Sequence, residues 1–317
     1  MKIIHNLENY IAEKSSIITI GTFDGLHIGH QKIISDLVSI SKKEKLVSIL
    51  LTFFPHPRMV LQDSNIEMID TIDEKQDLLK NLGVDFLIIH PFSNDFSRLV
   101  PIDFIRDVLV NKFKISKILV GYDHRFGRNR EANISDLKNF GEAYNFSVNV
   151  IPAQEIKSVS VSSTKIRSAI IKGDIKTANK YLGREFKLTG KVIKGNSIGR
   201  KLGFPTANLK VDEEYKIRPS KGVYLIQCII DSKLFFGMMN YGKRPTLEGK
   251  ENTIEIHFFS LNKDLYGLKL GIEILEKIRF EKKFDSLESL KKQLILDQKE
   301  CQKLLMLNKK LISNNNH

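Results

Sequence analysis

The segment Thr19-Ile20-Gly21-Thr22-Phe23-Asp24-Gly25-Leu26-His27-Ile28-Gly29-His30 governs the interpretation of the first half of the chain. An apolar run leads into glycines that permit a tight turn, and apolar residues with helical spacing follow. This order predicts a strand over 17–21 and a helix over 29–43. Backbone N–H groups and the helix dipole at such a junction favour an anion, and Gly29 lets a nucleotide approach the main chain closely.

Two histidines in this segment, His27 and His30, are three residues apart and fall on one side of the turn. Their ring N–H groups can donate to phosphate oxygens as negative charge shifts during displacement at phosphorus. The alternative is a helix-capping turn with two surface histidines, and the tetrapeptide alone does not decide between the two interpretations.

Outward from this segment, strand and helix patterns alternate. Further strands are predicted over 46–53, 85–90, 117–121 and 147–151, and further helices over 73–82, 101–110 and 134–144. Alternation of this kind indicates a parallel sheet with helices on both faces. Ligands of such sheets bind beyond the carboxyl ends of the strands.

After about residue 181 the pattern changes to successive short strands. They are predicted over 186–194, 222–231, 233–240, 252–260 and 270–280, with no convincing helix between them. Such a run indicates a closed antiparallel β-barrel, and 286–307 reads as one long amphipathic C-terminal helix. A chain of 317 residues exceeds the size of one usual core, so two domains are expected, 1–183 and 184–317.

Two more segments of the first domain could bind a nucleotide. Ser162-Ser163-Thr164-Lys165-Ile166-Arg167 places hydroxyl groups at an expected helix N-cap, followed by two cations, which suits a pyrophosphate. Gly121-Tyr122-Asp123-His124-Arg125-Phe126-Gly127 directly follows a strand, where a loop lines the ligand crevice. Taken alone, the first could be an ordinary cap and the second an ordinary turn.

With Thr52-Phe53-Phe54-Pro55-His56-Pro57 added, residues 15 to 182 resemble the nucleotidyltransferase half of prokaryotic FAD synthetases. That family carries G-x-F-D-G-x-H-x-G-H, T-F-x-P-H-P, G-x-D-x-x-F-G and S-S-T-x-I-R in this order. The resemblance implies a Rossmann-like α/β domain with His27 and His30 at its catalytic centre. The nucleotide-binding residues that it implies are Gly21, Phe23, Asp24, Gly29, Asp123, Ser163, Thr164 and Arg167. It places Pro55, Pro57 and Phe126 beside the flavin ring, and one departure is Ala132, where many relatives carry glycine.

A second glycine-rich, basic stretch runs from Gly190 to Asn208. It contains no Walker loop, and the chain has no G-x-G-x-x-G for a dinucleotide-dependent dehydrogenase. It offers backbone amides, cations at Arg200 and Lys201, and uncharged oxygens at Thr206 and Asn208. Mg²⁺ accepts few protein ligands and completes its shell with water and phosphate, so these oxygens suit it. The alternative is a surface hairpin with a proline-stabilised turn.

The run Gly199-Arg200-Lys201-Leu202-Gly203-Phe204-Pro205-Thr206-Ala207-Asn208 resembles the riboflavin kinase signature G-R-x-L-G-F-P-T-A-N. Segments 222–224, 240–246, 254–257 and 265–267 follow in that family's order, so the resemblance covers about residues 185 to 300. Tyr241 departs from the usual small aliphatic residue. The resemblance implies that Gly199 and Arg200 bind nucleotide, that Thr206 and Asn208 hold Mg²⁺-ATP, and that Glu255 is the catalytic base.

Together the two resemblances imply a bifunctional enzyme of flavin cofactor biosynthesis. Riboflavin would take the γ-phosphate of ATP to give FMN, and FMN would then be adenylylated to FAD with release of pyrophosphate. Riboflavin, FMN, FAD and ATP are thus the expected ligands, and Mg²⁺ the expected cofactor. Strand alternation puts Glu255 and His257 on one face, where a carboxylate can accept the proton of a primary alcohol.

Composition limits the remaining alternatives. The formal charge of +13 comes from a lysine-rich chain with scattered cations, so no nucleic-acid or membrane partner is expected. No apolar run reaches the ~18 residues of a membrane helix, and the N-terminus and two cysteines indicate a cytoplasmic protein. One rival is an H-x-G-H adenylyltransferase for another cofactor precursor, although such enzymes need no kinase barrel. The other is a basic RNA-binding protein, although aromatics such as Tyr224, Phe235 and Phe258 take core-like strand positions.

Overall fold

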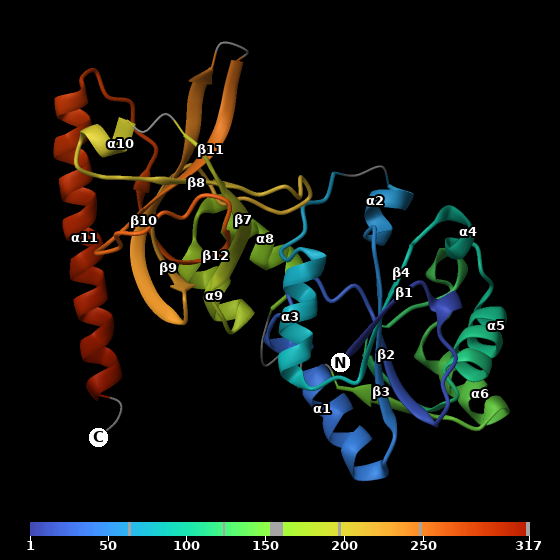
Figure 1. The fold of residues 1–317 in the computed structure, drawn as a ribbon. Coiled ribbons are helices and arrows are strands. Elements are labelled where there is room, and N and C mark those ends of the chain that lie inside the picture. The colour runs from blue at the N-terminus through green and yellow to red at the C-terminus, as the bar shows by residue number, and fades with distance from the viewer. Residues whose placement is uncertain (63–64, 123, 153–160, 196–197, 247–248, 315–317) are drawn as a thin grey trace. The chain divides into compact units, whose positions relative to one another are not determined.

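The structure is a computed structural model that describes residues 1–62, 65–122, 124–152, 161–195, 198–246 and 249–314. Contacts between Cα atoms divide the chain into two compact units, Met1–Ser163 and Thr164–His317. The first runs from blue to green in Figure 1 and the second from green to red.

The first unit is built on a parallel sheet with the strand order β1-β4-β3-β2-β5-β6. Its strands are β1 (Lys2–His5), β2 (Ser16–Ile20), β3 (Val47–Phe53), β4 (Phe86–His90), β5 (Ile115–Gly121) and β6 (Ser147–Ile151). The fold class predicted for this half is therefore confirmed. The four-residue strand β1 was not predicted, because so short an edge strand carries no alternating pattern.

Helices cover both faces of this sheet (Figure 1). They are η1 (Leu7–Asn9), α1 (Ile28–Glu44), α2 (Pro57–Leu61), α3 (Ile72–Leu82), α4 (Asn94–Ser97), α5 (Pro101–Asp103), η2 (Phe104–Lys112), η3 (Arg128–Arg130) and α6 (Ile134–Tyr144). A hydrophobic core lies on each face of the sheet, and successive residues of β3 point alternately into the two cores. Leu50 packs with Ile34 of α1 and Leu79 of α3 in one of them. Ile49 and Leu51 belong to the opposite core, which contains Phe104 and Leu137. Period-two alternation thus lets one buried strand hold two helical layers.

The helix predicted over 101–110 takes an unexpected form. Only α5 is α-helical, and Phe104–Lys112 forms the π-helix η2. The N–H of Phe113 bonds to the carbonyl of Val108, five residues back, at 3.1 Å. This wider turn brings Phe104, Val108 and Phe113 into one core, which regular α-helical spacing would not do.

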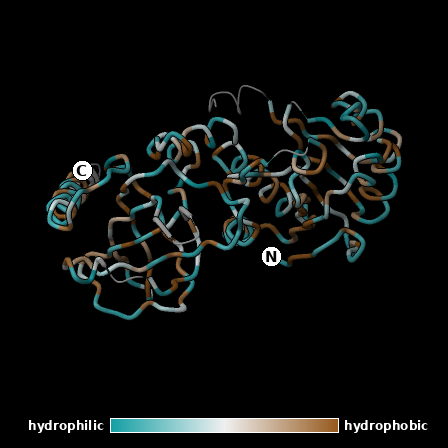
Figure 2. Tube along the Cα trace, turned by 90° about the horizontal axis from the view of Figure 1, so that it is seen from above, coloured by the Kyte–Doolittle hydropathy of each residue, from teal (hydrophilic) through white to brown (hydrophobic). Residues whose placement is uncertain are grey.

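The second unit is a closed antiparallel barrel with the order β10-β11-β8-β7-β12-β9, as predicted for this half. Its strands are β7 (Phe186–Ile193), β8 (Ala207–Lys210), β9 (Gly222–Ile230), β10 (Lys233–Thr246), β11 (Gly249–Phe258) and β12 (Lys269–Phe280). Hydrophobic and hydrophilic residues are interleaved along these strands (Figure 2), as expected when one face of each strand points inward. Strand β8 was missed, because it is short and lies within the glycine-rich stretch.

Four helices accompany the barrel in the described ranges. They are α8 (Ser163–Lys172), α9 (Ile175–Leu182), α10 (Ile198–Lys201) and α11 (Leu287–Asn314). The expectation of no helix between the strands was wrong at α10, a single turn too short for periodicity to reveal. Helix α11 packs on the barrel through Leu294, Cys301 and Leu304, and the buried Asp297 pairs with Arg279 at 2.8 Å. None of the helices in the described part of the chain is long and apolar enough to cross a membrane.

The side chain of Asn179 bonds helix α9 to two strands of the barrel. The amide of Asn179 donates to the carbonyl of Ile274 at 2.9 Å and accepts from the N–H of Phe186 at 2.8 Å. The division into compact units therefore assigns α9 to the second unit. The domain boundary at 183/184 stays a prediction.

Two candidate active sites

The first candidate site is the turn that joins β2 to α1. Phe23, Gly25 and Leu26 all have positive φ, at 45°, 82° and 37°. A Cβ on Gly25 would lie 2.8 Å from Cδ1 of Ile69, so this position requires glycine for space as well as for conformation. The turn lies where β2 borders both β3 and β5, the point at which the strand order reverses and ligands of such sheets bind.

His27 is the N-cap residue of α1. Its Nδ1 accepts a hydrogen bond from the N–H of His30 at 3.3 Å, and its ring stacks on that of His30 with centroids 3.7 Å apart. His27 is therefore a cap, as the alternative interpretation held, but it is buried, with 6% of its surface exposed. His30 is partly exposed, and its ring meets that of Phe23 edge-on at 5.2 Å.

Both histidines are held neutral. Burial lowers the pKa of His27 to about 4. Burial also lowers the pKa of His30 well below its usual value, and repulsion from a protonated His27 and from the charge of Lys75 acts in the same direction. Because Nδ1 of neutral His27 accepts a hydrogen bond, its proton sits on Nε2. Nδ1 of His30 is buried without a partner among the described residues, which likewise favours the proton on Nε2. Each ring can thus offer one N–H to a phosphate oxygen.

Main-chain contacts tie other predicted nucleotide-binding residues to this turn. Asp24 is 1% exposed, and its Oδ1 accepts from the N–H of Ile69 at 2.9 Å. The hydroxyl of Ser163 donates to the carbonyl of Asp24 at 2.9 Å. A Cβ on Gly21 would lie 3.2 Å from the ring of Phe23, so that ring covers the end of β2. Gly29 is buried in the first turn of α1.

Two more residues predicted to bind nucleotide begin helix α8. Thr164 is exposed and Arg167 is partly buried, and both belong to the second compact unit. Arg167 lies three and four positions after Thr164 and Ser163, so all three share one helix face. Asp123 lies outside the described residues.

The residues predicted beside the flavin ring follow the ends of β3 and β5. Pro55 is exposed and joined to Phe54 by a cis peptide bond, and Pro57 opens α2. Phe126 is only 8% exposed, and its ring centroid lies 6.4 Å from that of Phe104. It belongs to a chain of rings at successive centroid distances of 5.5 to 6.5 Å that sequence reasoning missed. This chain consists of Phe92, Phe53, Phe96, Phe104, Phe126 and Phe140.

The second candidate site lies across β8 and β11. The register pairs Glu255 with Asn208 and, on its other side, with Asn240. Directly opposed residues of antiparallel strands have Cβ atoms ~5 Å apart on one face, so these polar side chains are neighbours. Thr206 precedes Asn208 by two residues and falls on the same side. The side chains of Thr206, Asn208 and Glu255 are half-buried, and none has a hydrogen-bond partner among the described residues.

Glycines bring the preceding loop close to these side chains. A Cβ on Gly195 would lie 2.1 Å from Nδ2 of Asn208, and one on Gly199 would lie 3.3 Å from Oγ1 of Thr206. A larger residue at position 195 would displace the Asn208 side chain, and one at position 199 would collide with the carbonyl of Phe204, 2.3 Å from the Cβ position. Arg200 follows in α10 and is exposed, as a phosphate-binding cation at a site entrance would be. Hydroxyl and amide oxygens beside one carboxylate fit a Mg²⁺ ion that keeps water and phosphate ligands.

His257 lies on the same face of β11 as Glu255, two residues further along the strand. Its Nδ1 lies 2.9 Å from the carbonyl of Pro205, and its ring packs edge-on against Phe204 at 5.2 Å. The residue is 9% exposed, so the strand face that it shares with Glu255 is enclosed at this end. Tyr224 and Phe258 are buried as their strand positions suggested, whereas Phe235 is only half-buried.

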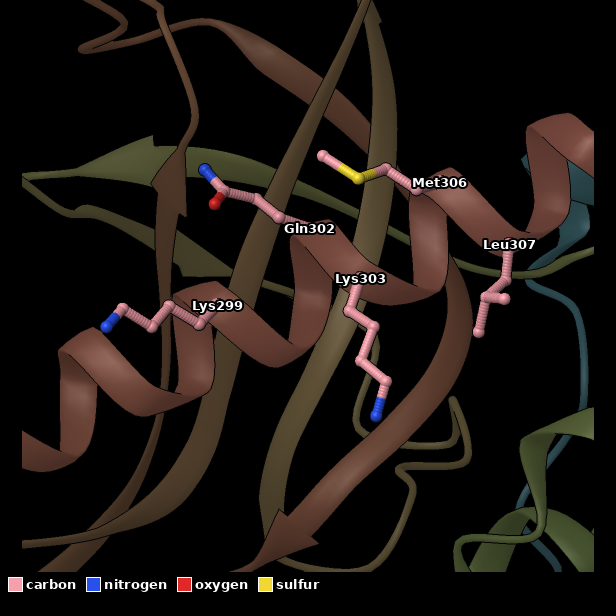
Figure 3. Close-up of a pocket in the computed structure, with 5 residues that line it drawn as sticks. All are labelled: Lys299, Gln302, Lys303, Met306 and Leu307. Carbon is pink, nitrogen blue, oxygen red and sulfur yellow. The ribbon is translucent and has the colours of Figure 1, made fainter.

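Two surface hollows lie elsewhere. One of about 270 Å³ is lined by α11 residues alone, and Figure 3 shows Gln302 and Met306 on one flank of the helix with Lys303 and Leu307 on the other. A second, of about 600 Å³, lies beside α6 and the start of β6. Neither is lined by a predicted site residue. In the described part of the chain, no group of three or more His, Cys, Asp or Glu side chains could hold a metal.

Sequence reasoning also missed Lys75, which lies at the first site. It is 1% exposed, and its Nζ donates to the carbonyl of Thr22 at 2.7 Å. A signal was present, because Lys75 falls on the apolar face of α3 with Ile72 and Leu79, at spacings of three and four.

A parallel sheet with a glycine-containing turn at its switch point, followed by a closed antiparallel barrel whose register pairs Asn208 with Glu255, indicates a two-domain protein of the nucleotide-dependent transferase class. The FAD synthetase family model matches residues 10–165, and the riboflavin kinase family model matches residues 182–305. The chain belongs to the family of bifunctional riboflavin kinases/FMN adenylyltransferases. It therefore carries both activities and acts in flavin cofactor biosynthesis.

Relatives named bifunctional riboflavin kinase/FMN adenylyltransferase cover nearly the whole chain. That of Buchnera aphidicola subsp. Schizaphis graminum is 38% identical over 93% of this chain and 95% of its own. That of Escherichia coli K12 is 32% identical over 96% of this chain and 97% of its own. A crystal structure described as a macrolide-efflux protein from Streptococcus pneumoniae covers 95% of this chain and 99% of its own, with 31% identity and a TM-score of 0.87.

Proposed function

We propose that riboflavin is phosphorylated at the β8–β11 site with Glu255 as the base. As the 5′-oxygen of riboflavin forms its bond to the γ-phosphorus of ATP, the Glu255 carboxylate accepts the hydroxyl proton, and ADP leaves. The observation that carries this assignment is the register that sets Glu255 directly opposite Asn208. With a base and a metal-binding oxygen on one strand face, the 5′-hydroxyl of riboflavin and the γ-phosphate of ATP can be bound next to each other.

In this proposal Thr206 and Asn208 hold Mg²⁺ with ATP, and Gly199 and Arg200 contact the nucleotide. The close approach of Gly195 and Gly199 to these two side chains supports the assignment. Mg²⁺ bound here would neutralise charge on the phosphate oxygens. The protein supplies few ligands of its own, which agrees with the preference of Mg²⁺ for water and phosphate.

At the β2–α1 turn, an FMN phosphate oxygen attacks the α-phosphorus of ATP, and pyrophosphate leaves. The Nε2–H groups of His27 and His30 donate to phosphate oxygens as charge builds up on them. The remaining nucleotide contacts are assigned to Gly21, Phe23, Asp24, Gly29, Asp123, Ser163, Thr164 and Arg167. No covalent enzyme intermediate is needed, so positioning and electrostatic stabilisation provide the rate.

The flavin contacts of this first site are assigned to Pro55, Pro57 and Phe126. Pro55 is exposed beyond the end of β3, where a ring can stack on it. We further propose a cytoplasmic protein that uses neither nucleic acid nor membrane as a partner, with domains 1–183 and 184–317. Before the C-terminal segment 282–310 the lysines are scattered along the chain, which supports the first assignment, and the change from alternating helices and strands to successive strands at β7 supports the domain division.

Incubation with riboflavin, ATP and Mg²⁺, followed by chromatographic separation of the flavins, tests the proposal. We expect FMN and FAD to form with Mg²⁺ and neither to form without it. Supplying FMN in place of riboflavin isolates the second step. Unmodified riboflavin under all conditions would contradict the kinase assignment, and FMN that is never adenylylated would contradict the other.

A further inference from the structure

A buried cation lies beneath the catalytic turn of the first site. Lys75 extends from the first turns of α3, and its Nζ donates to the carbonyl of Thr22 at 2.7 Å. The hydroxyl of Thr52 donates to the same carbonyl at 3.2 Å. Thr22 precedes Phe23, whose left-handed φ begins the turn, so two donors from outside the turn fix the point where the strand leaves the sheet.

Two buried carboxylates, those of Asp24 and Asp70, interact with the charge of Lys75. The carboxylates of Asp24 and Asp70 raise the pKa of Lys75, whereas burial, the larger effect, lowers it. Both aspartates are 1% exposed. Asp24 is itself part of the turn and holds the N–H of Ile69 at 2.9 Å. A lysine is rarely buried without such partners, so this position is specified by its charge and not by its apolar stem.

The same charge acts on the histidines. The ring of His30 lies against those of His27 and Phe23, and burial lowers its pKa, to which the positive charge of Lys75 adds in the same direction. The buried Nδ1 of His30 has no partner within the described ranges that could stabilise a second proton. A neutral ring keeps one defined N–H for the ligand, whereas a protonated one would place a buried, unpaired donor next to Lys75.

We propose that Lys75 is a positioning residue of the adenylyltransferase site, which holds the Thr22–Asp24 turn in place and fixes the protonation state of His30. This inference rests on the proposed roles of His27 and His30. Lys75 does not contact the reacting atoms. It acts through the turn and through the histidine.

The test compares Lys75→Met with wild type in the full chain, across about pH 5.5 to 8.5. Methionine keeps the length of the stem but removes the charge and the hydrogen bond to Thr22. We expect FMN adenylylation at about pH 7 to fall ~10²-fold, since displaced catalytic groups cost rates of this order. The remaining activity should also begin to decline at a higher pH than in wild type, because loss of the Lys75 charge raises the pKa of His30, which burial still holds below its ordinary value.

Two controls accompany the variant. Riboflavin phosphorylation by the same sample should be unchanged, because it takes place in the barrel. Lys80→Met makes the same substitution at an exposed position of α3 and should leave both activities and the pH profile unchanged. Should Lys75→Met fail to fold, Lys75→Met/Asp70→Asn removes a buried charge of each sign together and provides the same readouts.

The possible results distinguish the role of Lys75 from the proposed adenylyltransferase function of the turn. Wild-type adenylylation by Lys75→Met, or a loss of equal size at every pH, would overturn the role of Lys75. A wild-type chain that makes no FAD from FMN would instead overturn the proposed function of the turn. A loss that grows as the pH falls, with kinase activity intact, is the expected result.

Discussion

The turn after β2 and the strand pair β8–β11 present their polar side chains in opposite ways. At the turn, Asp24 and Lys75 are 1% exposed and His27 is 6% exposed, so the polar groups of the proposed site are buried in the core. On the barrel, Thr206, Asn208 and Glu255 are half-buried and are aligned by the strand register alone. A buried site depends on the neighbours that satisfy each group, whereas a site on a strand face depends on the regular geometry of the sheet.

This difference predicts how each site responds to mutation. A substitution on the strand face should remove one chemical role and leave the fold unchanged. A substitution in the turn should also alter the environment of its neighbours, because each buried group there sets the charge state of another. The two activities share one chain, so the unaffected activity reports the amount of protein in each assay.

The largest effect is expected for Glu255→Gln, which keeps the shape of the side chain but removes its basic lone pair. Riboflavin phosphorylation should fall ~10²–10⁴-fold, the usual contribution of a positioned base, while both substrates still bind. Rates of FMN and FAD formation, measured separately, check this. FMN supplied from outside should still be converted to FAD.

Glu273→Gln is a matched control for that variant, because Glu273 is also a half-buried barrel glutamate, and it accepts a hydrogen bond from Gln227 at 2.8 Å. It should phosphorylate riboflavin at nearly the wild-type rate. Comparable loss in both variants would mean that Glu255 is one strand glutamate among others and not the base.

A smaller effect is expected for His30→Ala. Loss of one donor that stabilises developing charge costs ~10²-fold, so FAD formation should fall by about this factor while riboflavin phosphorylation continues. His5→Ala, an exposed histidine on β1, should change neither rate. Equal damage to both activities by His30→Ala would indicate that the two reactions share a site or that the turn supports the whole fold.

The same contrast explains what the sequence could reveal. On the barrel, a contiguous motif singled out Asn208 and strand alternation put Glu255 and His257 on one face, whereas the pairing of Glu255 with Asn208 became visible only with strand β8, which was not predicted. The partners of the turn come from three separate segments, and the contacts of Thr22 with Lys75 and of Asp24 with Ser163 span 53 and 139 residues. No local pattern encodes such pairings. Lys75 in particular reads as a solvated helix lysine until its apolar-face spacing is noticed.

Elements were predicted best where burial is periodic. Helix α6 and strand β6 have the predicted bounds, since their patterns are complete. Short elements without a period, such as β8 and α10, were missed, and η2 took π-helical form because its core contacts favour a wider turn. Tertiary packing decided these cases against local propensity.

The smallest effect we predict concerns the pH dependence of stability at the turn. The pKa of His27 falls from 6.5 to about 4 on folding, chiefly through burial. Between these values the unfolded chain binds a proton that the folded chain does not, so stability is fully present above about pH 6.5 and declines as the pH drops towards 4. At about pH 5 the loss amounts to ~2 kcal/mol relative to neutral pH. His27→Asn keeps an N-cap acceptor but has no titrating group, so its decline should be smaller by that amount. Hydrogen exchange of the α1 amides in increasing denaturant reports on this unit separately from the barrel. Parallel pH dependences in wild type and His27→Asn would show that His27 titrates normally, and the stacked pair could then not be the neutral donors that distinguish this site from the barrel.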